Sequence, residues 1–187
     1  MSKELKIITS TTRENAQGIK IANWVNDYVK NNSDFNVELL DLKAINLPLM
    51  DEPHHPRLKK YQHEHTKKWS EKIDEADAYI IILSEYNFGF PAPIKNALDY
   101  LFNEWKYKPV GFVSYGGVSG GLRATQMLKQ VVTTLSMMPL AEQVNIPFFS
   151  KLIDENGVFQ TNEIIEKSLG NMLNELNKWS TVMKSMR

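Results

Sequence analysis

A run of six apolar residues, Ala78-Tyr-Ile-Ile-Ile-Leu83, constrains the fold of this chain more than any other stretch. Such a run is typical of a strand buried on both faces, as in a parallel sheet. Polar side chains follow in Glu85–Asn87, and Pro91 and Pro93 stiffen the turn into the next helix. Ligands of open α/β sheets bind at the carboxyl ends of strands. The loop is therefore a candidate binding site, with an ordinary strand-to-helix connection as the alternative.

A hydroxyl-rich segment with one arginine, Ser10–Asn15, separates the expected strand Leu5–Thr9 from an expected helix. That helix has one apolar stripe, formed by Ile21, Trp24, Val25, Tyr28 and Val29. This layout favours phosphate binding, because backbone N–H groups and the helix dipole face the anion, and arginine adds a charged donor. Helix capping beside a solvated arginine is the alternative. The sequence contains neither the GxGxxG pattern nor a P-loop.

Glycines dominate the segment that follows the expected strand Tyr107–Tyr115. Gly116–Gly121 holds four glycines in six residues, which permits positive φ angles and a close approach of the backbone to a flat ligand. A flexible turn is the alternative. A helix with regular apolar spacing follows, at Ala124, Met127, Leu128, Val131, Val132 and Leu135.

Five strands alternate with helices along the chain. The other two strands are Asn36–Leu42 and Leu140–Ile146, and further helices cover Leu58–Ala76 and the residues from about Thr161. This alternation predicts an α/β fold, a doubly wound five-stranded parallel sheet of order 2-1-3-4-5 with helices on both faces. In that order the three special loops meet beside the first and third strands. At 187 residues, we expect residues 1–187 to form one domain.

All four histidines lie in or after a long irregular crossover, Ile45–Arg57, that contains three prolines. Imidazole is a common metal ligand, so a metal site is one interpretation. His63 and His65 are two residues apart, however, and would not share a face of the expected helix. A polar crossover and a partly exposed helix are the favoured interpretation, and we expect no metal.

The charge balance gives little reason to expect a nucleic-acid or membrane partner. Acidic and basic residues number 22 each, so no net field favours an anionic surface. The chain has no cysteine, which excludes disulfides and thiolate chemistry. The first residues are charged and show no long apolar segment. These features predict a soluble, cytoplasmic protein.

The loop after the buried run carries a series of short motifs: Ser84-Glu-Tyr-Asn87, Phe90-Pro91, Ile94-Lys-Asn-Ala97 and Asp99-Tyr-Leu101. The series resembles the central signature of the NADPH-dependent FMN reductase family, which reads Pro-Glu-Tyr-Asn, Tyr-Pro, Leu-Lys-Asn-Ala and Asp-Trp-Leu. These are flavodoxin-like proteins that include quinone, azo-dye and chromate reductases. Ser10-Thr-Thr-Arg13 is similar to the family's phosphate loop, and Ser114-Tyr-Gly-Gly117 to its third flavin-contacting loop.

The resemblance implies FMN-binding residues in all three loops. Thr11 and Arg13 would hold the FMN phosphate, helped by Ser10 or Gln17. The second loop would border the isoalloxazine ring and the ribityl chain, mainly through backbone groups, at Ser84, Glu85, Tyr86, Asn87 and Phe88. The third loop would approach the pyrimidine end of the ring, at Ser114, Tyr115, Gly116 and Gly117.

The chain departs from the family pattern at three positions. Ser10 replaces the usual glycine and adds a Cβ atom where the backbone approaches the phosphate. Ser84 replaces proline, which we expect to loosen the second loop. Ala16 stands where many members have serine or arginine, so one phosphate contact is missing. Arg13, the charged anchor, is retained.

The activity that the resemblance implies is an FMN-dependent NAD(P)H oxidoreductase. Hydride would pass from NADPH or NADH through FMN to a quinone, a free flavin or a similar small acceptor, with no residue acting as acid, base or nucleophile. The resemblance also implies a homodimer or homotetramer. The alternatives are a flavodoxin-type FMN electron carrier without NAD(P)H activity and a non-enzymatic regulatory protein on the same fold.

Overall fold

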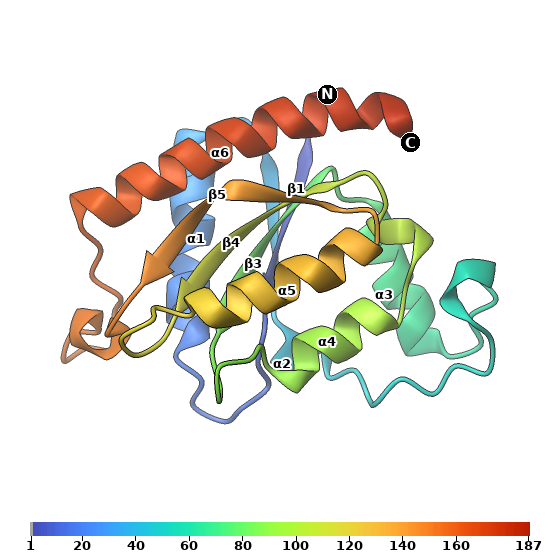
Figure 1. Cartoon of the computed structure of the whole chain (residues 1–187), viewed down its shortest axis with the longest axis horizontal. Coiled ribbons are helices and arrows are strands. Elements are labelled where there is room, and N and C mark those ends of the chain that lie inside the picture. Colours follow the sequence, from blue (N-terminus) through green and yellow to red (C-terminus); the bar gives the residue numbers. More distant parts are fainter. Residues whose placement is uncertain (1) are drawn as a thin grey trace.

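A five-stranded parallel sheet of order β2-β1-β3-β4-β5 forms the centre of the molecule, as the sequence predicts. The structure is a computed structural model, and it describes residues 2–187. The strands are β1 (Glu4–Thr9), β2 (Asn36–Leu40), β3 (Ala78–Ser84), β4 (Pro109–Tyr115) and β5 (Met138–Ile146). In that order β3 is the middle strand, and Figure 1 shows β4 beside it.

The position of β3 in the sheet explains the apolar run Ala78–Leu83, and β4 beside it is buried in the same way. All seven residues of β3 and all seven of β4 are buried, because helices cover both faces of the sheet and strands flank both edges. The edge strand β2 is only partly buried. A run that is apolar at every position therefore indicates a strand inside the sheet. Polar residues of this segment can reach the surface only beyond the carboxyl end of β3.

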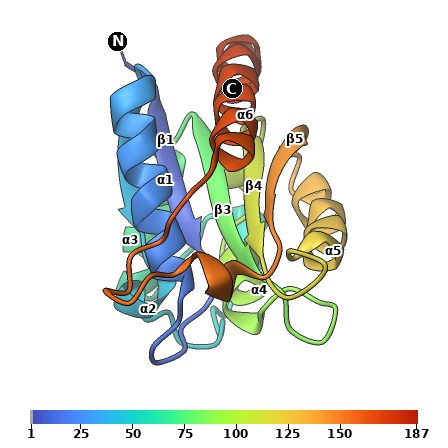
Figure 2. The ribbon, with the colours of Figure 1, turned by 90° about the vertical axis from the view of Figure 1, so that its left-hand side faces the viewer.

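Helices pack on both faces, as predicted. They are α1 (Gly18–Asn32), α2 (Leu42–Ile45), α3 (Glu64–Asp74), α4 (Ala92–Asp99), α5 (Leu122–Thr134) and α6 (Glu163–Met183). One core cluster joins the sheet to α1 and α6, and the other joins it to α3, α4 and α5. Figure 2 shows α1 and α5 on opposite sides of the sheet. No helix within residues 2–187 is long and apolar enough to cross a membrane.

The helix expected over Leu58–Ala76 begins six residues later, at Glu64. A short 3-10 turn ends at Lys59, which adopts a left-handed conformation with φ 50°. The Glu52 carboxylate then accepts the backbone N–H groups of Gln62 (2.8 Å) and His63 (3.0 Å), which keeps this segment extended. The Glu52 side chain, in the preceding crossover, thus sets the start of α3. The helical spacing of apolar residues does not reveal such a bond.

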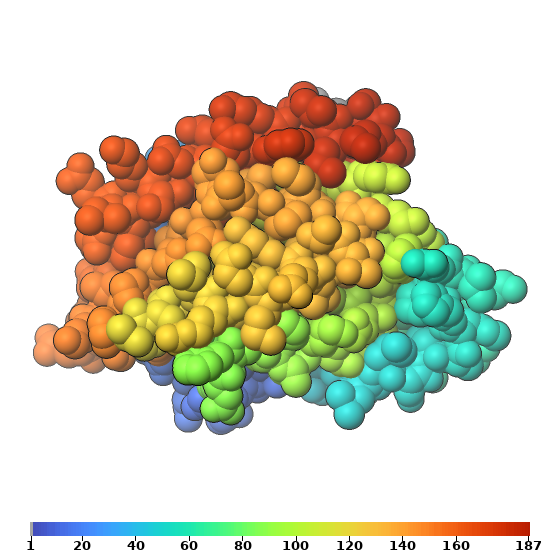
Figure 3. Space-filling model, viewed as in Figure 1, coloured from blue at the N-terminus to red at the C-terminus, as the bar shows by residue number. Residues whose placement is uncertain are grey.

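The crossover between α2 and α3 is held against α4 by the motif residue Asn96. Its amide donates to the carbonyl of Pro48 (2.7 Å) and accepts the N–H of Met50 (2.9 Å), and Tyr100 donates to the same Pro48 carbonyl (3.0 Å). Leu49, between the two anchored residues, is 82% exposed. Figure 3 shows the crossover as a ridge at one end of the molecule.

A buried lysine caps the carboxyl end of α3. Lys108 is 2% exposed and donates to the carbonyls of Ile73 (2.8 Å) and Asp74 (3.0 Å). Burial lowers the pKa of Lys108 to about 7. Since a lysine in the unfolded chain titrates near 10.4, folding releases a proton between these two values.

The substitution Lys108→Met therefore tests a pH dependence of stability. Between pH 7 and pH 10 the unfolded wild type binds more protons than the folded protein, so its free energy of unfolding rises relative to the variant, by up to about 1.4 kcal/mol per pH unit. Urea unfolding of both proteins at pH 7, 8 and 9 measures this difference. A difference that stays constant with pH would mean that Lys108 remains charged in the folded protein.

Candidate functional site

A hollow of about 260 Å³ lies where the loops after β1, β3 and β4 meet, at the carboxyl edge of the sheet. We call it the three-loop hollow, and its lining residues are Arg13, Asn15, Ala16, Gln17, Ser84, Glu85, Tyr86, Tyr115, Gly116 and Phe149. Seven of these were expected from the sequence. Ala16 was named only as a position where a phosphate contact is missing. Asn15 and Phe149 were missed, although Phe149 follows the carboxyl end of β5 and could have been found by the same rule that indicated the other loops.

The first loop turns the open start of α1 toward the hollow. Gln17, at the N-cap of α1, donates its side-chain amide to the carbonyl of Asn15 (3.0 Å) rather than capping the helix. Asn15 has a positive φ of 57°, and Thr11 accepts the backbone N–H of Arg13 (3.3 Å). Arg13 and the N-cap residue Gln17 line the same hollow, and a guanidinium close to a helix N-terminus is suited to an anion.

A second hollow of about 310 Å³ lies beside the first, on the side of β2 and α2, and Thr11 and Arg13 line it. Thr11 is therefore close to the three-loop hollow without lining it. Arg13, Asn15 and Ala16 line both hollows, so the segment 13–16 separates them.

Ser10 and Ser84, two departures from the family pattern, are bonded to each other. The Ser84 backbone N–H donates to the Ser10 hydroxyl (3.1 Å), and the two hydroxyl oxygens lie 3.4 Å apart. Both residues are nearly buried. Proline at position 84 would have no N–H, and glycine at position 10 would have no hydroxyl. The loosening that the sequence suggested at Ser84 is thus offset by a bond that the family's proline and glycine could not form.

The second loop forms a two-residue hairpin turn. Tyr86 and Gly89 exchange two backbone hydrogen bonds (3.0 and 2.9 Å), and both residues between them, Asn87 and Phe88, have positive φ angles of 50° and 69°. This is the geometry of a type I′ turn, in which a phenylalanine is unusual. Neither Asn87 nor Phe88 lines the three-loop hollow, and Phe88 is 64% exposed.

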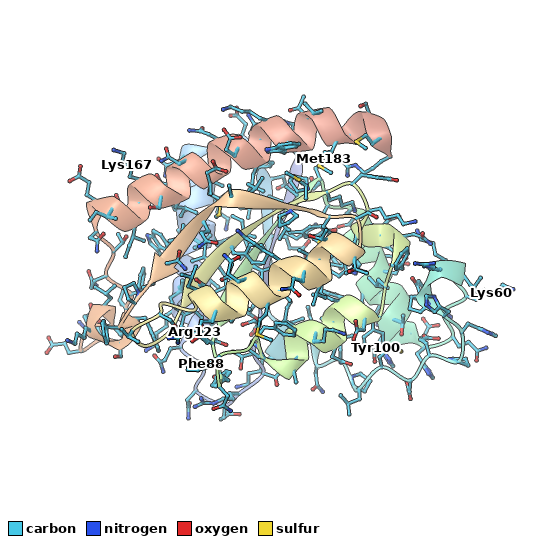
Figure 4. The ribbon with its side chains drawn as sticks, viewed as in Figure 1. Lys60, Phe88, Tyr100, Arg123, Lys167 and Met183 are labelled. Atoms are coloured by element: carbon cyan, nitrogen blue, oxygen red, sulfur yellow. The ribbon has the colours of Figure 1, made fainter. Side chains whose placement is uncertain are left out.

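Two arginines hold this hairpin from either side. Arg13 donates to the Tyr86 hydroxyl (3.1 Å), and the Arg123 guanidinium lies 4.1 Å from the centre of the Phe88 ring. Figure 4 shows Phe88 at the tip of its loop with Arg123 beside it. Arg123 was not expected from the sequence, because the glycine-rich segment before it gave no indication that the next helix turns toward the second loop.

In the third loop, the side chains of Ser114 and Tyr115 point into the protein. The Ser114 hydroxyl donates to the Gly120 carbonyl (2.8 Å) and accepts from Asn145 (2.7 Å). Tyr115 packs edge-on against Phe149, with ring centres 5.0 Å apart, and burial raises its pKa to about 12. These two residues can therefore offer mainly backbone groups to a ligand, and the Tyr115 hydroxyl stays protonated.

Gly116 and Gly117 form the exposed part of the third loop. A Cβ atom added to Gly117 would meet nothing within 4 Å, so this position faces open space. The loop is held in place from β5, because Phe148 donates its backbone N–H to the Gly117 carbonyl (3.0 Å). A flat ligand could therefore approach the backbone closely at this point.

The histidines do not gather into a metal site. Within residues 2–187, no group of three or more potential ligand side chains is placed to hold a metal ion. The rings of His63 and His65 nevertheless stack, with centres 5.2 Å apart, although the sequence suggested that they would not share a face. The reason is that α3 begins at Glu64, which leaves His63 on extended backbone at the N-cap.

The fold and the site together define a flavodoxin-like α/β protein in which the loops after β1, β3 and β4 border one hollow. A sequence model of the NADPH-dependent FMN reductase family matches residues 4–151. The chain belongs to this family. The expected class, an oxidoreductase that works with FMN and NAD(P)H, is thereby confirmed.

Individual relatives agree with the family match. An NAD(P)H-dependent FMN reductase of Schizosaccharomyces pombe is 34% identical over 99% of this chain and 92% of its own length. An NADPH:quinone oxidoreductase of Arabidopsis thaliana is 34% identical over 58% of this chain and 52% of its own length. In structure, the NAD(P)H:(acceptor) oxidoreductase of Paracoccus denitrificans matches with a TM-score of 0.78 over 97% of this chain and 98% of that one, at 21% identity. The structural likeness bears on the fold alone.

The substitution Ser10→Ala tests the bond between the first and second loops. It leaves the nearly buried Ser84 N–H without its acceptor, which should lower the free energy of unfolding by about 1–3 kcal/mol. Urea unfolding measures the change. Ser168→Ala, which removes an exposed hydroxyl on α6, is the control and should cost less than about 0.5 kcal/mol. Equal effects of the two changes would contradict this role of Ser10.

Proposed function

We propose that this chain binds FMN in the three-loop hollow and carries hydride from NAD(P)H to a quinone, a free flavin or a similar small acceptor. One observation carries the proposal: the loops after β1, β3 and β4 border one hollow, with Arg13 and the open start of α1 at one end. We further propose that residues 1–187 act as a single domain.

The residues around the hollow fit FMN. The phosphate is assigned to the place where the three-loop hollow meets the second hollow, beside Thr11, Arg13 and the first N–H groups of α1, with Gln17 next to them. Ser10 contributes indirectly, because its hydroxyl is already used by Ser84. The departure at Ala16 removes one hydroxyl or charge from the lining of the hollow but leaves the cationic end intact.

The ring and the ribityl chain are assigned to the second and third loops. Ser84 and Glu85 would offer backbone groups, Tyr86 would border the hollow, and Asn87 and Phe88 would shape its outer rim. The backbone of Ser114–Gly117 would face the pyrimidine end of the ring, because the side chains of this segment point away or are hydrogen atoms.

FMN supplies, when bound, the hydride chemistry between NAD(P)H and an acceptor. The protein supplies position and electrostatics. Tyr115 stays protonated because of its burial, and the pKa of Glu85 is held below its usual range, so neither is suited to move a proton near neutral pH. We therefore assign no acid, base or nucleophile.

The names of the relatives support the acceptor class. The Arabidopsis relative is named for quinone reduction, which favours a quinone among the possible small acceptors. The balanced charge of this chain does not favour a flavodoxin-type carrier, which needs a charged surface for docking protein partners. We propose a cytoplasmic enzyme without a nucleic-acid or membrane partner.

We also propose that the chain works as a homodimer or homotetramer. Leu49, 82% exposed on a crossover that Asn96 holds in place, is suited to pack against a second copy near that copy's flavin. Sedimentation equilibrium measures the mass in solution, and a monomer at micromolar concentration would contradict this part of the proposal.

Anaerobic reduction tests the proposed reaction. The purified protein is reconstituted with FMN, and the flavin absorbance is followed while NADPH or NADH is added. Rapid bleaching is expected. A bound flavin that stays oxidised would support the electron carrier instead, and a protein that binds no flavin would support a regulatory role.

The substitution Arg13→Ala tests the phosphate assignment. Loss of a charged hydrogen bond to phosphate should weaken FMN binding about tenfold to a hundredfold. Quenching of flavin fluorescence measures the Kd. Lys30→Ala, at the other end of α1, removes a positive charge far from the hollow and should leave the Kd unchanged. Unchanged FMN affinity in Arg13→Ala would overturn the assignment.

A further inference from the structure

Glu85 lines the three-loop hollow, and its carboxylate is bonded to the start of α5. It accepts hydrogen bonds from the Ser119 hydroxyl (2.7 Å), from the backbone N–H groups of Arg123 (3.0 Å) and Ala124 (3.2 Å), and from the Arg123 guanidinium (3.1 Å). Its side chain is 9% exposed. Four donors from a segment more than 30 residues away thus converge on one carboxylate from the second loop.

Helix α5 depends on this distant cap because it cannot have a local one. Gly121 occupies the N-cap position with φ 82°. A Cβ atom at this position would lie 2.8 Å from the Ser114 side chain and 2.9 Å from the Tyr115 nitrogen, so only glycine fits. The N–H group of Leu122 donates to the nearby Ser119 carbonyl (3.1 Å), whereas those of Arg123 and Ala124 take their acceptor from another loop. A carboxylate at a helix N-terminus is further stabilised by the helix dipole.

The ionised state of Glu85 is secured by the same contacts. Burial alone would raise the pKa of Glu85, but the hydrogen bonds from Ser119, Ala124 and Arg123 outweigh that effect and hold the pKa below its usual range. A carboxylate with four donors has little capacity left to accept a proton or to contact a ligand.

The position of Glu85 in the chain gives this cap a consequence for the site. Ser84, its neighbour, bonds the first loop through Ser10, and Tyr86, its other neighbour, begins the hairpin. Gly116, in the third loop, lines the same hollow as Glu85. A bond between Glu85 and the start of α5 therefore sets the separation of the second and third loops across the hollow.

We propose that Glu85 is a positioning residue, whose carboxylate ties the second loop to the start of α5 and so fixes the backbone groups on both sides of the flavin. The proposal rests on the proposed FMN site. It adds a role for the carboxylate to the one that the family resemblance implies for this loop, a border to the flavin mainly through backbone groups, because the Glu85 carboxylate is bonded to the start of α5.

Three variants test this role: Glu85→Ala, Glu85→Gln and Asn162→Ala. Asn162→Ala is the matched control, because it removes the cap of α6, a 3.0 Å bond to the N–H of Ile165, at a helix outside the three-loop hollow. We expect Glu85→Ala to weaken FMN binding about tenfold and to move the reduction potential of the bound flavin to a more positive value, because a negative charge is lost. Glu85→Gln, which keeps one acceptor oxygen, should recover part of the affinity.

The control should lose similar thermal stability while keeping the wild-type Kd and reduction potential. Wild-type values of both quantities in Glu85→Ala would reduce Glu85 to a helix cap and overturn the proposal. The pH profile of NAD(P)H oxidation between pH 6 and pH 8 should have the same shape in Glu85→Gln as in the wild type. A lost limb would instead make Glu85 a proton-transfer group and would also overturn the proposal.

Hydrogen exchange of the FMN-free protein tests the coupling without the flavin. In Glu85→Ala, exchange should become faster at Arg123 and Ala124 and also at Tyr86 and Gly89, whose N–H groups close the hairpin. Faster exchange confined to α5 would contradict the proposal. The hydrogen-exchange experiment tests the role of Glu85 even if the wild type binds no FMN. Absence of FMN binding would refute the proposed function and not the coupling of the loops.

Discussion

The structure of the site depends on two adjacent residues, Ser84 and Glu85, whose hydrogen bonds go to two different segments. The Ser84 N–H donates to Ser10 of the first loop, and the Glu85 carboxylate accepts from the start of α5 after the third loop. These bonds join segments 74 and nearly 40 residues apart in sequence. Loops are usually the most mobile parts of a domain. Here their relative positions follow from side-chain bonds that exist only after the sheet has placed the carboxyl ends of β1, β3 and β4 side by side.

Much of this architecture follows from the sequence by simple rules. A run of residues that are apolar at every position indicated the central strand β3. The alternation of strands and helices predicted the order of the sheet. That order brings the loops after β1, β3 and β4 together, so the region of the site was predictable without any knowledge of side-chain geometry. The spacing of apolar residues repeats along a strand or a helix, so the sequence of that segment alone is enough to recognise it.

The direction of individual side chains was not predictable in the same way. Ser114 was expected at the ligand, yet its hydroxyl turns inward, because its partner Asn145 comes from β5. Tyr115 lines the hollow, but its ring packs against Phe149, which comes from the turn after β5. The start of α3 depends on Glu52, and the bond between Ser10 and Ser84 joins two residues that look like separate departures from a family pattern. Each case involves one hydrogen bond or one ring contact between distant segments, and the periodic pattern of apolar residues does not predict such a contact. A shared motif therefore contains residues that line the hollow and also residues, such as Asn96 and Glu85, whose side chains bond to other segments.

The central claim is that the open start of α1, with Arg13, forms the anchor for a flavin phosphate. Comparison of FMN with riboflavin, which has the same ring and ribityl chain without the phosphate, tests this claim most directly. The account predicts that the wild-type protein binds FMN at least about a hundredfold more tightly than riboflavin, because the charged hydrogen bonds at the phosphate are lost. Equal dissociation constants for the two ligands, measured by fluorescence quenching in the same buffer, would contradict it.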